Sequence, residues 1–131
     1  MLKKETVRTI MERKLRRLIR NTEFLISLRT YATLPEAHEL SETVLSKLKL
    51  QLKLNSFMLE DARSDQEKKK LEDERKELQA ALAAELENGL GILASIITNL
   101  KMRDMEEKAE ELEILKDVRE SELLELTGGK A

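Results

Sequence analysis

Few residues in this chain are of a type that could do chemistry. His38 is the only histidine among 131 residues, and cysteine is absent. The lack of cysteine excludes disulfides and zinc sites built on thiolates. The sequence also contains no glycine-rich phosphate loop, no Glu-x-x-His pair typical of di-iron sites, and no Ser-His-Asp set beyond chance. These observations predict a protein that is not an enzyme and that carries no cofactor or metal.

The single histidine has a sequence context that can be compared with a known motif. Ala37-His38-Glu39-Leu40, near the start of a predicted helix, resembles the His-Glu-Leu core of the phospho-accepting helix of sensor histidine kinases. That resemblance implies phosphotransfer through an exposed His38, assisted by the neighbouring acid. Ser41-Glu42-Thr43 stands where that family usually carries Arg-Thr-Pro. The preferred interpretation is a surface histidine without a catalytic role.

A cluster of basic residues lies in the first predicted helix. Its arginines are Arg13, Arg16, Arg17 and Arg20. Such a cluster could follow a phosphate backbone, because Lys and Arg supply most of the sequence-independent affinity for nucleic acid. Aromatic residues for base stacking are few, since the chain has one Tyr and two Phe. Nucleic-acid binding is therefore an alternative function rather than the leading one.

Charge is distributed unevenly along the chain. Residues 1–32 carry nine basic and three acidic side chains, a net charge of +6, whereas residues 104–131 carry four basic and ten acidic ones, a net charge of −6. Within the acidic segment, carboxylates recur at spacings of three and four at Glu106, Glu107, Glu110 and Glu111. They could hold a hard cation loosely, but a solvated acidic helix face is the preferred interpretation.

The elements that position these residues are predicted to be helices. The chain is 38% charged and 2% aromatic, with one Pro and four Gly, which is typical of long helices and excludes a turn-rich all-β fold. Apolar residues at spacings of three and four predict helices over about residues 2–30, 34–62, 66–102 and 105–126.

Helix boundaries are signalled by capping residues. Residues 33–36 and 64–67 read as capping boxes that open the second and third helices, and Asp104 is expected to cap the fourth. The third helix is expected to continue, straight or kinked, through Gly89. The alternative is that Gly89 ends it in a left-handed cap and a new helix begins near Leu90. In a continuous helix, Gly89 and Gly91 would allow a neighbouring backbone to approach closely.

Short loops make sequential helices antiparallel neighbours. We therefore predict an all-α fold, an antiparallel four-helix bundle over residues 1–126, followed by a flexible tail over residues 127–131. In such a bundle the first and fourth helices adjoin, so the basic residues 8–17 would face the acidic residues 117–125. The alternative is that the two charged ends of the chain bind two partners of opposite charge. The apolar positions that define the fourth helix are Met105, Ala109, Leu112, Leu115, Val118 and Leu123.

The second predicted helix is apolar over most of its circumference. One face carries Leu45, Leu48, Leu52 and Leu59, and a separate face carries Leu50, Leu54 and Phe57. A small bundle buries one broad face per helix, so the second face is expected to bind a protein partner, either another copy of this chain or a different protein. The alternative is a thick core closed by the third helix alone.

Membrane and secretion signals are not evident in the sequence. The longest apolar window, residues 89–97, is far shorter than the roughly 18 residues that a membrane span requires. Lys3 and Lys4 are followed by further charge, where a secretory signal would have an apolar core. We therefore expect a cytoplasmic protein that does not use a membrane.

The order of these parts resembles the helical domain of GINS subunits, which belong to the replicative helicase assembly of archaea and eukaryotes. As in that family, a basic first helix precedes a Leu34-Pro35 pair that opens the second helix. Leu71-Glu72-Asp73-Glu74-Arg75 and Met105-Glu106-Glu107-Lys108 are similar to segments of its later helices. The small β-domain of those subunits has no counterpart here. Over about residues 13–120, the resemblance implies contacts with sister subunits and the helicase during DNA replication.

The leading prediction is a non-catalytic helical interaction or assembly subunit that forms an oligomer. Partner contacts are expected through Leu50, Leu54 and Phe57, with the four arginines of the first helix as a secondary surface. No small-molecule substrate is predicted. The alternatives are nucleic-acid binding by the first helix and histidine phosphotransfer through His38.

Overall fold

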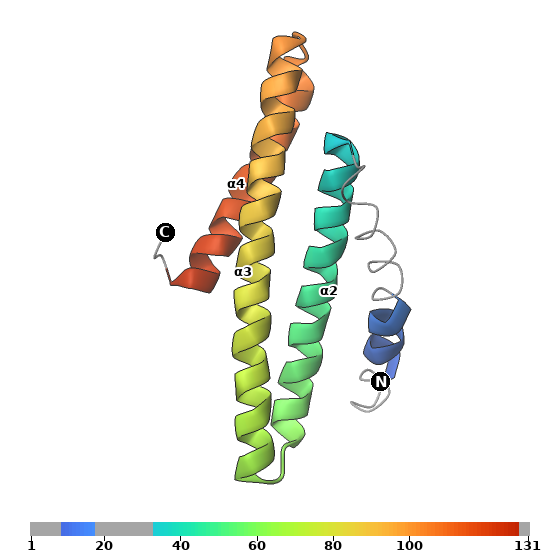
Figure 1. Cartoon of the computed structure of the whole chain (residues 1–131), viewed down its shortest axis with the longest axis vertical. Helices are drawn as coiled ribbons and strands as arrows, with labels where there is room; N and C mark the ends of the chain where they lie inside the picture. The colour runs from blue at the N-terminus through green and yellow to red at the C-terminus, as the bar shows by residue number, and fades with distance from the viewer. Residues whose placement is uncertain (1–8, 18–32, 129–131) are drawn as a thin grey trace.

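The computed structural model describes residues 9–17 and 33–128, and within these ranges all regular structure is helical (Figure 1). The helices are a segment over residues 9–17, α2 (Leu34–Asp61), α3 (Asp65–Met102) and α4 (Glu106–Thr127). α2 and α3 run antiparallel, as do α3 and α4 (Figure 1). The predicted all-α, four-helix architecture is confirmed. The remainder of the predicted first helix and residues 129–131 of the predicted tail lie outside the described residues.

Local capping explains where α2 and α3 begin. The hydroxyl of Thr33 accepts a hydrogen bond from the backbone N–H of Glu36 at 3.4 Å, and Pro35 occupies the first turn. At α3, the hydroxyl of Ser64 accepts from the backbone N–H of Glu67 at 3.1 Å. Each hydroxyl satisfies a backbone donor that has no partner within its own helix. Both predicted capping boxes therefore mark true helix starts.

The prediction that Asp104 caps α4 is wrong. Asp104 has a φ of 57°, and the N-cap of α4 is Met105, which makes no side-chain capping hydrogen bond. The backbone N–H groups of Asp104 and Met105 instead donate to the carbonyls of Lys101 and Leu100, at 3.2 and 2.9 Å. This pair of bonds is a Schellman motif, which closes α3 and requires a left-handed residue at the position of Asp104. The turn into α4 thus depends on how α3 ends.

The core forms where α2 packs against α3. Its central cluster consists of Leu45, Leu48, Leu82 and Leu86. α4 covers this cluster from one end with Leu123 and Leu126, which are partly buried against it. The leucines that alternate over residues 48–54 fall inside α2, so the helical interpretation of that stretch is confirmed.

One polar side chain lies inside this apolar contact. Asn55 of α2 is only 2% exposed, and its side-chain amide donates to the backbone carbonyl of Leu71 in α3 at 2.9 Å. A buried amide is costly to leave without a partner, so a shift of α2 along α3 that breaks this bond is disfavoured. Asn55 therefore helps to fix the register of the two helices.

A glycine allows α2 and α3 to approach closely near the middle of α3. Gly89 is buried, and a Cβ added there would lie 2.9 Å from the Oγ of Ser41. A Cβ at Gly91 would meet nothing within 4 Å. α3 is continuous through both residues, as predicted, but only Gly89 serves a close contact. Its neighbour is a side chain rather than the expected backbone.

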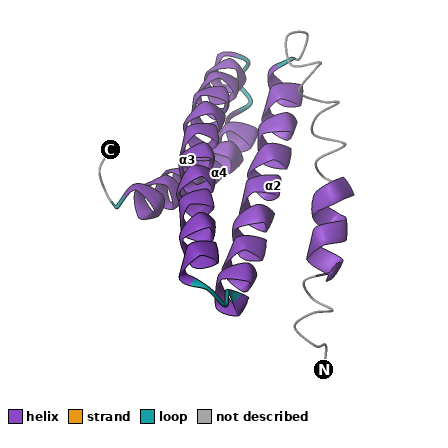
Figure 2. Cartoon of the chain, turned by 60° about the horizontal axis from the view of Figure 1, so that its bottom comes forward, coloured by secondary structure: helices purple, strands orange, loops and turns teal. Residues whose placement is uncertain are grey.

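The first described segment does not adjoin α4, so that expectation was wrong. In Figures 1 and 2, α2 lies between residues 9–17 and the other two helices. The acidic side chains of α4 instead meet cations on α2, α3 and α4 itself. The basic residues 9–17 and the acidic α4 are therefore separated by the body of the bundle.

Alanine substitution at the two glycines of α3 should give opposite results. Gly91→Ala should raise the free energy of unfolding by up to about 1 kcal/mol, because Ala is the better helix former and the site is open. Gly89→Ala should lower it by about 1–3 kcal/mol, because the new methyl group crowds Ser41. Chemical denaturation would measure both. Adding Ser41→Ala to Gly89→Ala should recover most of the loss, and equal stabilisation by both glycine substitutions would contradict the close contact.

Candidate functional site

The predicted partner-binding residues of α2 are half-buried. Leu50, Leu54 and Phe57 are neither enclosed by the fold nor fully exposed. The segment of residues 9–17 lies alongside α2 in Figures 1 and 2, and its Met11 is only 9% exposed. Residues 9–17 thus lie beside α2, as expected of sequential helices in a bundle, on the side of α2 away from α3. Binding of a partner at these three residues remains a prediction.

α4 presents a larger uncovered surface. Among its 22 residues, all of them described, only Ala109 is buried. The apolar side chains of Ile114, Val118 and Leu124 are 67%, 47% and 47% exposed. Val118 is one of the apolar positions that predicted this helix, whereas Ile114 and Leu124 are not among those positions. Their exposure follows from the way α4 crosses α3, which the sequence does not reveal.

These side chains belong to one continuous face of α4. Exposed residues recur at spacings of three and four, so they share one side of the helix. We call this set the outer face of α4, and it comprises Glu107, Glu110, Glu111, Ile114, Asp117, Val118, Ser121, Leu124 and Glu125. It carries five carboxylates, and the exposed cation Lys108 lies at its edge, three residues before Glu111, so the face is both partly apolar and predominantly acidic.

The described part of the predicted basic surface is also exposed. Arg13, Arg16 and Arg17 are exposed, whereas Arg20 lies outside the described residues. Arg16 is 75% exposed and lies 3.9 Å from the carboxylate of Glu12, which is a weak surface contact. The guanidinium groups are therefore available to a partner of opposite charge.

His38 and the carboxylates of α4 form no recognisable reactive site. His38 is half-buried near the start of α2, and Glu39 beside it is exposed. Glu106, Glu107, Glu110 and Glu111 are all exposed. Over the described residues, no group of three or more metal-ligating side chains is placed to hold an ion. Phosphotransfer through His38 stays a prediction.

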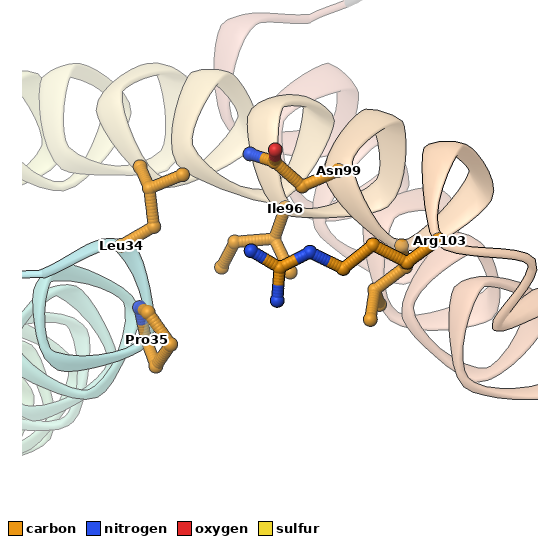
Figure 3. A pocket seen from close by; sticks show the side chains of 6 residues that line it. Leu34, Pro35, Ile96, Asn99 and Arg103 are labelled. Carbon is orange, nitrogen blue, oxygen red and sulfur yellow. The ribbon is translucent and has the colours of Figure 1, made fainter.

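A shallow groove lies where the start of α2 approaches the end of α3. Its volume is about 290 Å³, and it is lined by Leu34, Pro35, Ile96, Asn99, Leu100 and Arg103. Figure 3 shows Arg103 extending from the end of α3 toward Ile96, across from Leu34 and Pro35. Apart from Asn99, the walls are apolar with a single cation. No acid–base pair is among the residues that line the groove.

A network of charged side chains docks α4 onto α2. Arg119 of α4 donates from Nε to Oε1 of Glu42 at 3.3 Å and from Nη2 to its other oxygen, which is a two-pronged contact. Its Nη1 donates to Glu122 at 2.8 Å, and Nζ of Lys49 lies 2.9 Å from the second oxygen of Glu122. Burial alone would lower the pKa of Arg119, but the hydrogen bonds and charges of Glu42 and Glu122 outweigh it and raise the pKa.

A second contact fastens α4 to α3 near the turn between them. Nζ of Lys101 lies 2.6 Å from the carboxylate of Glu113. The hydrogen bond and the charge of Glu113 raise the pKa of Lys101. Because these pairs join the inner side of α4 to the bundle, its outer face keeps its own carboxylates unneutralised.

α3 is more apolar over a long stretch than the run of residues 89–97 indicated. It contains an 18-residue window with a mean hydropathy of 1.4, so among the described residues one helix meets the length and composition of a membrane span. This window is longer than the uninterrupted apolar run of residues 89–97, because up to two charged residues are allowed within it. Only 28% of it is buried. α3 nevertheless packs against both α2 and α4, as a central bundle helix does.

The charged network should couple α2 to α4 energetically. A double-mutant cycle of Glu42→Gln and Arg119→Met, followed by urea denaturation, should give a coupling energy of about 1 kcal/mol, because the pair is two-pronged and partly buried. The matched control is the surface pair Lys116 and Glu120, which lie 3.7 Å apart on one helix. Its cycle should give about 0.3 kcal/mol. Equal coupling in the two cycles would show that Arg119 does not hold α4.

Comparison with known proteins assigns no family to this chain. No protein-family model matches it, and no curated protein or solved structure matches it significantly. The resemblance to GINS subunits therefore remains a prediction that rests on the short motifs quoted above.

Proposed function

We propose that this protein is a non-catalytic helical subunit that works by assembling with other protein chains. The observation that carries the proposal is the outer face of α4, where Ile114, Val118 and Leu124 are exposed on one side of a helix. Single exposed apolar residues are ordinary on protein surfaces, but three on one helical face favour a binding surface.

Burial of the outer face of α4 by a partner would contribute free energy comparable to part of the cost of association. Full burial of one Ile, Val or Leu side chain contributes about 1.5–3 kcal/mol. Three such side chains on the outer face of α4 would offset a substantial part of the entropy lost on association. α4 alone buries only Ala109, so a partner would also stabilise the helix itself.

The half-buried residues of α2 support a second contact. Leu50, Leu54 and Phe57 retain exposed area although residues 9–17 lie beside α2. A partner that packs along α2 would bury the remainder. The finer proposal, based on the resemblance to GINS subunits, is that the partners are sister subunits and a replicative helicase and that the protein acts in DNA replication.

Light scattering of the full chain tests the assembly. We expect a mass well above the 15.1 kDa of one chain. Replacing Ile114 and Val118 together by Gln should lower that mass, because the substitutions remove apolar contacts and add no charge. Leu54→Glu should lower it as well if the second contact forms. The matched control is Met102→Gln, at an exposed apolar residue off the outer face of α4, which should leave the mass unchanged.

Two results would count against the proposal. One is a wild-type mass of 15.1 kDa at every protein concentration tested. The other is a mass that the α4 substitutions leave unaltered. Circular dichroism of each variant would show whether a lower mass reflects lost assembly or lost folding.

Nucleic-acid binding is a second candidate function. It is favoured by the exposure of Arg13, Arg16 and Arg17 on one short helical segment. Arg16→Glu with Arg17→Glu should abolish binding of a fluorescent oligonucleotide, and wild-type affinity should fall steeply with salt because phosphate contacts release counterions. Affinity that is insensitive to both salt and the substitutions would exclude this use of the segment.

A further inference from the structure

The described N-terminal segment has a face that mirrors the outer face of α4 in charge. Exposed residues recur there at the same helical spacing. We call them the basic face, and they are Thr9, Ile10, Arg13, Lys14, Arg16 and Arg17. Four cations surround an isoleucine that is 38% exposed. The segment turns Met11 inward, so its orientation keeps the cations outside.

The two faces match in chemical character. The outer face of α4 combines three exposed apolar side chains with five carboxylates, and the basic face combines Ile10 with four cations. At about 1.5 Å per residue, the basic face is roughly 12 Å long and the outer face of α4 roughly 27 Å long. The shorter face therefore fits within the longer one, with apolar side chains and opposite charges available on both.

These faces cannot meet within one molecule. α2 separates residues 9–17 from α4 in Figures 1 and 2. The inner side of α4 is already fixed by the contacts of Arg119 with Glu42 and of Lys101 with Glu113. Both faces consequently stay exposed on a single chain, and Arg16 of the basic face is paired only weakly, at 3.9 Å from Glu12.

We propose that the outer face of α4 binds the basic face of a second copy of this chain, so that copies associate head to tail. This inference rests on the proposed function and identifies its partner. Complementary charge would steer the copies together and select the orientation, while burial of Ile10, Ile114 and Val118 would hold the contact. Single surface ion pairs contribute little, so the contact depends on the whole set of charges.

The same geometry excludes the simplest symmetric dimer. Two outer faces of α4 would bring five carboxylates against five, and two basic faces would bring like cations together. The complementary faces lie on different sides of the bundle, so two copies cannot satisfy both at once. The contact is heterologous and generates open chains or closed rings, whose mass rises with protein concentration and falls with added salt.

Charge reversal on either face, followed by mixing, tests this arrangement. The first variant reverses the basic face with Arg13→Glu, Arg16→Glu and Arg17→Glu. The second reverses the outer face of α4 with Glu110→Lys, Glu111→Lys and Asp117→Lys. Alone, each variant should show a mass roughly twofold or more below that of the wild type in light scattering, because all its contacts are now between like charges. An equimolar mixture should regain the higher mass, because every contact again pairs opposite charges.

The control carries the same change in charge as the second variant, but elsewhere on the surface. Glu72→Lys, Asp73→Lys and Glu74→Lys replace three exposed acids on the first half of α3, off both faces. This variant should keep the wild-type mass. Thermal melting of all variants by circular dichroism separates loss of association from loss of the fold, and recovery of mass on mixing requires that both reversed chains are folded.

Three other outcomes would overturn the head-to-tail contact. If charge reversal leaves the mass unchanged while Ile114→Gln with Val118→Gln lowers it, assembly stands and the head-to-tail contact is overturned. A wild-type mass of one chain at all concentrations overturns both. A single-chain mass together with oligonucleotide binding that the basic-face variant abolishes overturns the head-to-tail contact and assigns the basic face to nucleic acid.

Discussion

One row of buried side chains along α3 is the interaction on which the rest of the structure depends. It consists of Leu71, Leu82, Leu86, Leu93 and Ile97. α3 packs against both α2 and α4, so this row is the shared partner of two helices that have far less contact with each other. Gly89 lies within the row and lets Ser41 of α2 come close, and Asn55 fixes the alignment of the two helices. Because the row determines where α4 crosses, it also decides which residues of α4 are left uncovered.

Features that depend on neighbours in the sequence were predictable. The hydroxyls of Thr33 and Ser64 reach backbone donors three residues ahead, so composition over four positions was enough to place two helix starts. Continuity of α3 through Gly89 followed from the unbroken spacing of its leucines. The role of Asp104 was mistaken because an acid before a helix usually reads as a cap. Here the preceding helix ends in a left-handed turn at that residue, and this backbone requirement leaves no such signature in the sequence.

Features that depend on tertiary packing were only partly predictable. The excess of apolar residues on α2 was visible, and the order of the helices placed the first helix beside α2, but helical spacing did not show how much of the second face would stay exposed. Likewise, the opposite charges of the chain ends were evident. Whether these charged ends meet within one molecule or face outward on separate sides depends on how the helices are arranged around α3. Exposure of Ile114 and Val118 has the same origin, since helical spacing alone cannot distinguish a core position from an uncovered one.

The slight burial of α4 has a consequence for motion. Only Ala109 of this helix is fully enclosed, whereas α2 and α3 bury a leucine cluster between them. Elements with few buried apolar contacts open at a lower free energy than the core elements do. α4 is thus the part of the molecule able to detach by sub-global opening while α2 and α3 stay packed, and its amide hydrogens would exchange with solvent ahead of those of α2 and α3. A chain that binds over α4 would first slow the exchange of the α4 amide hydrogens.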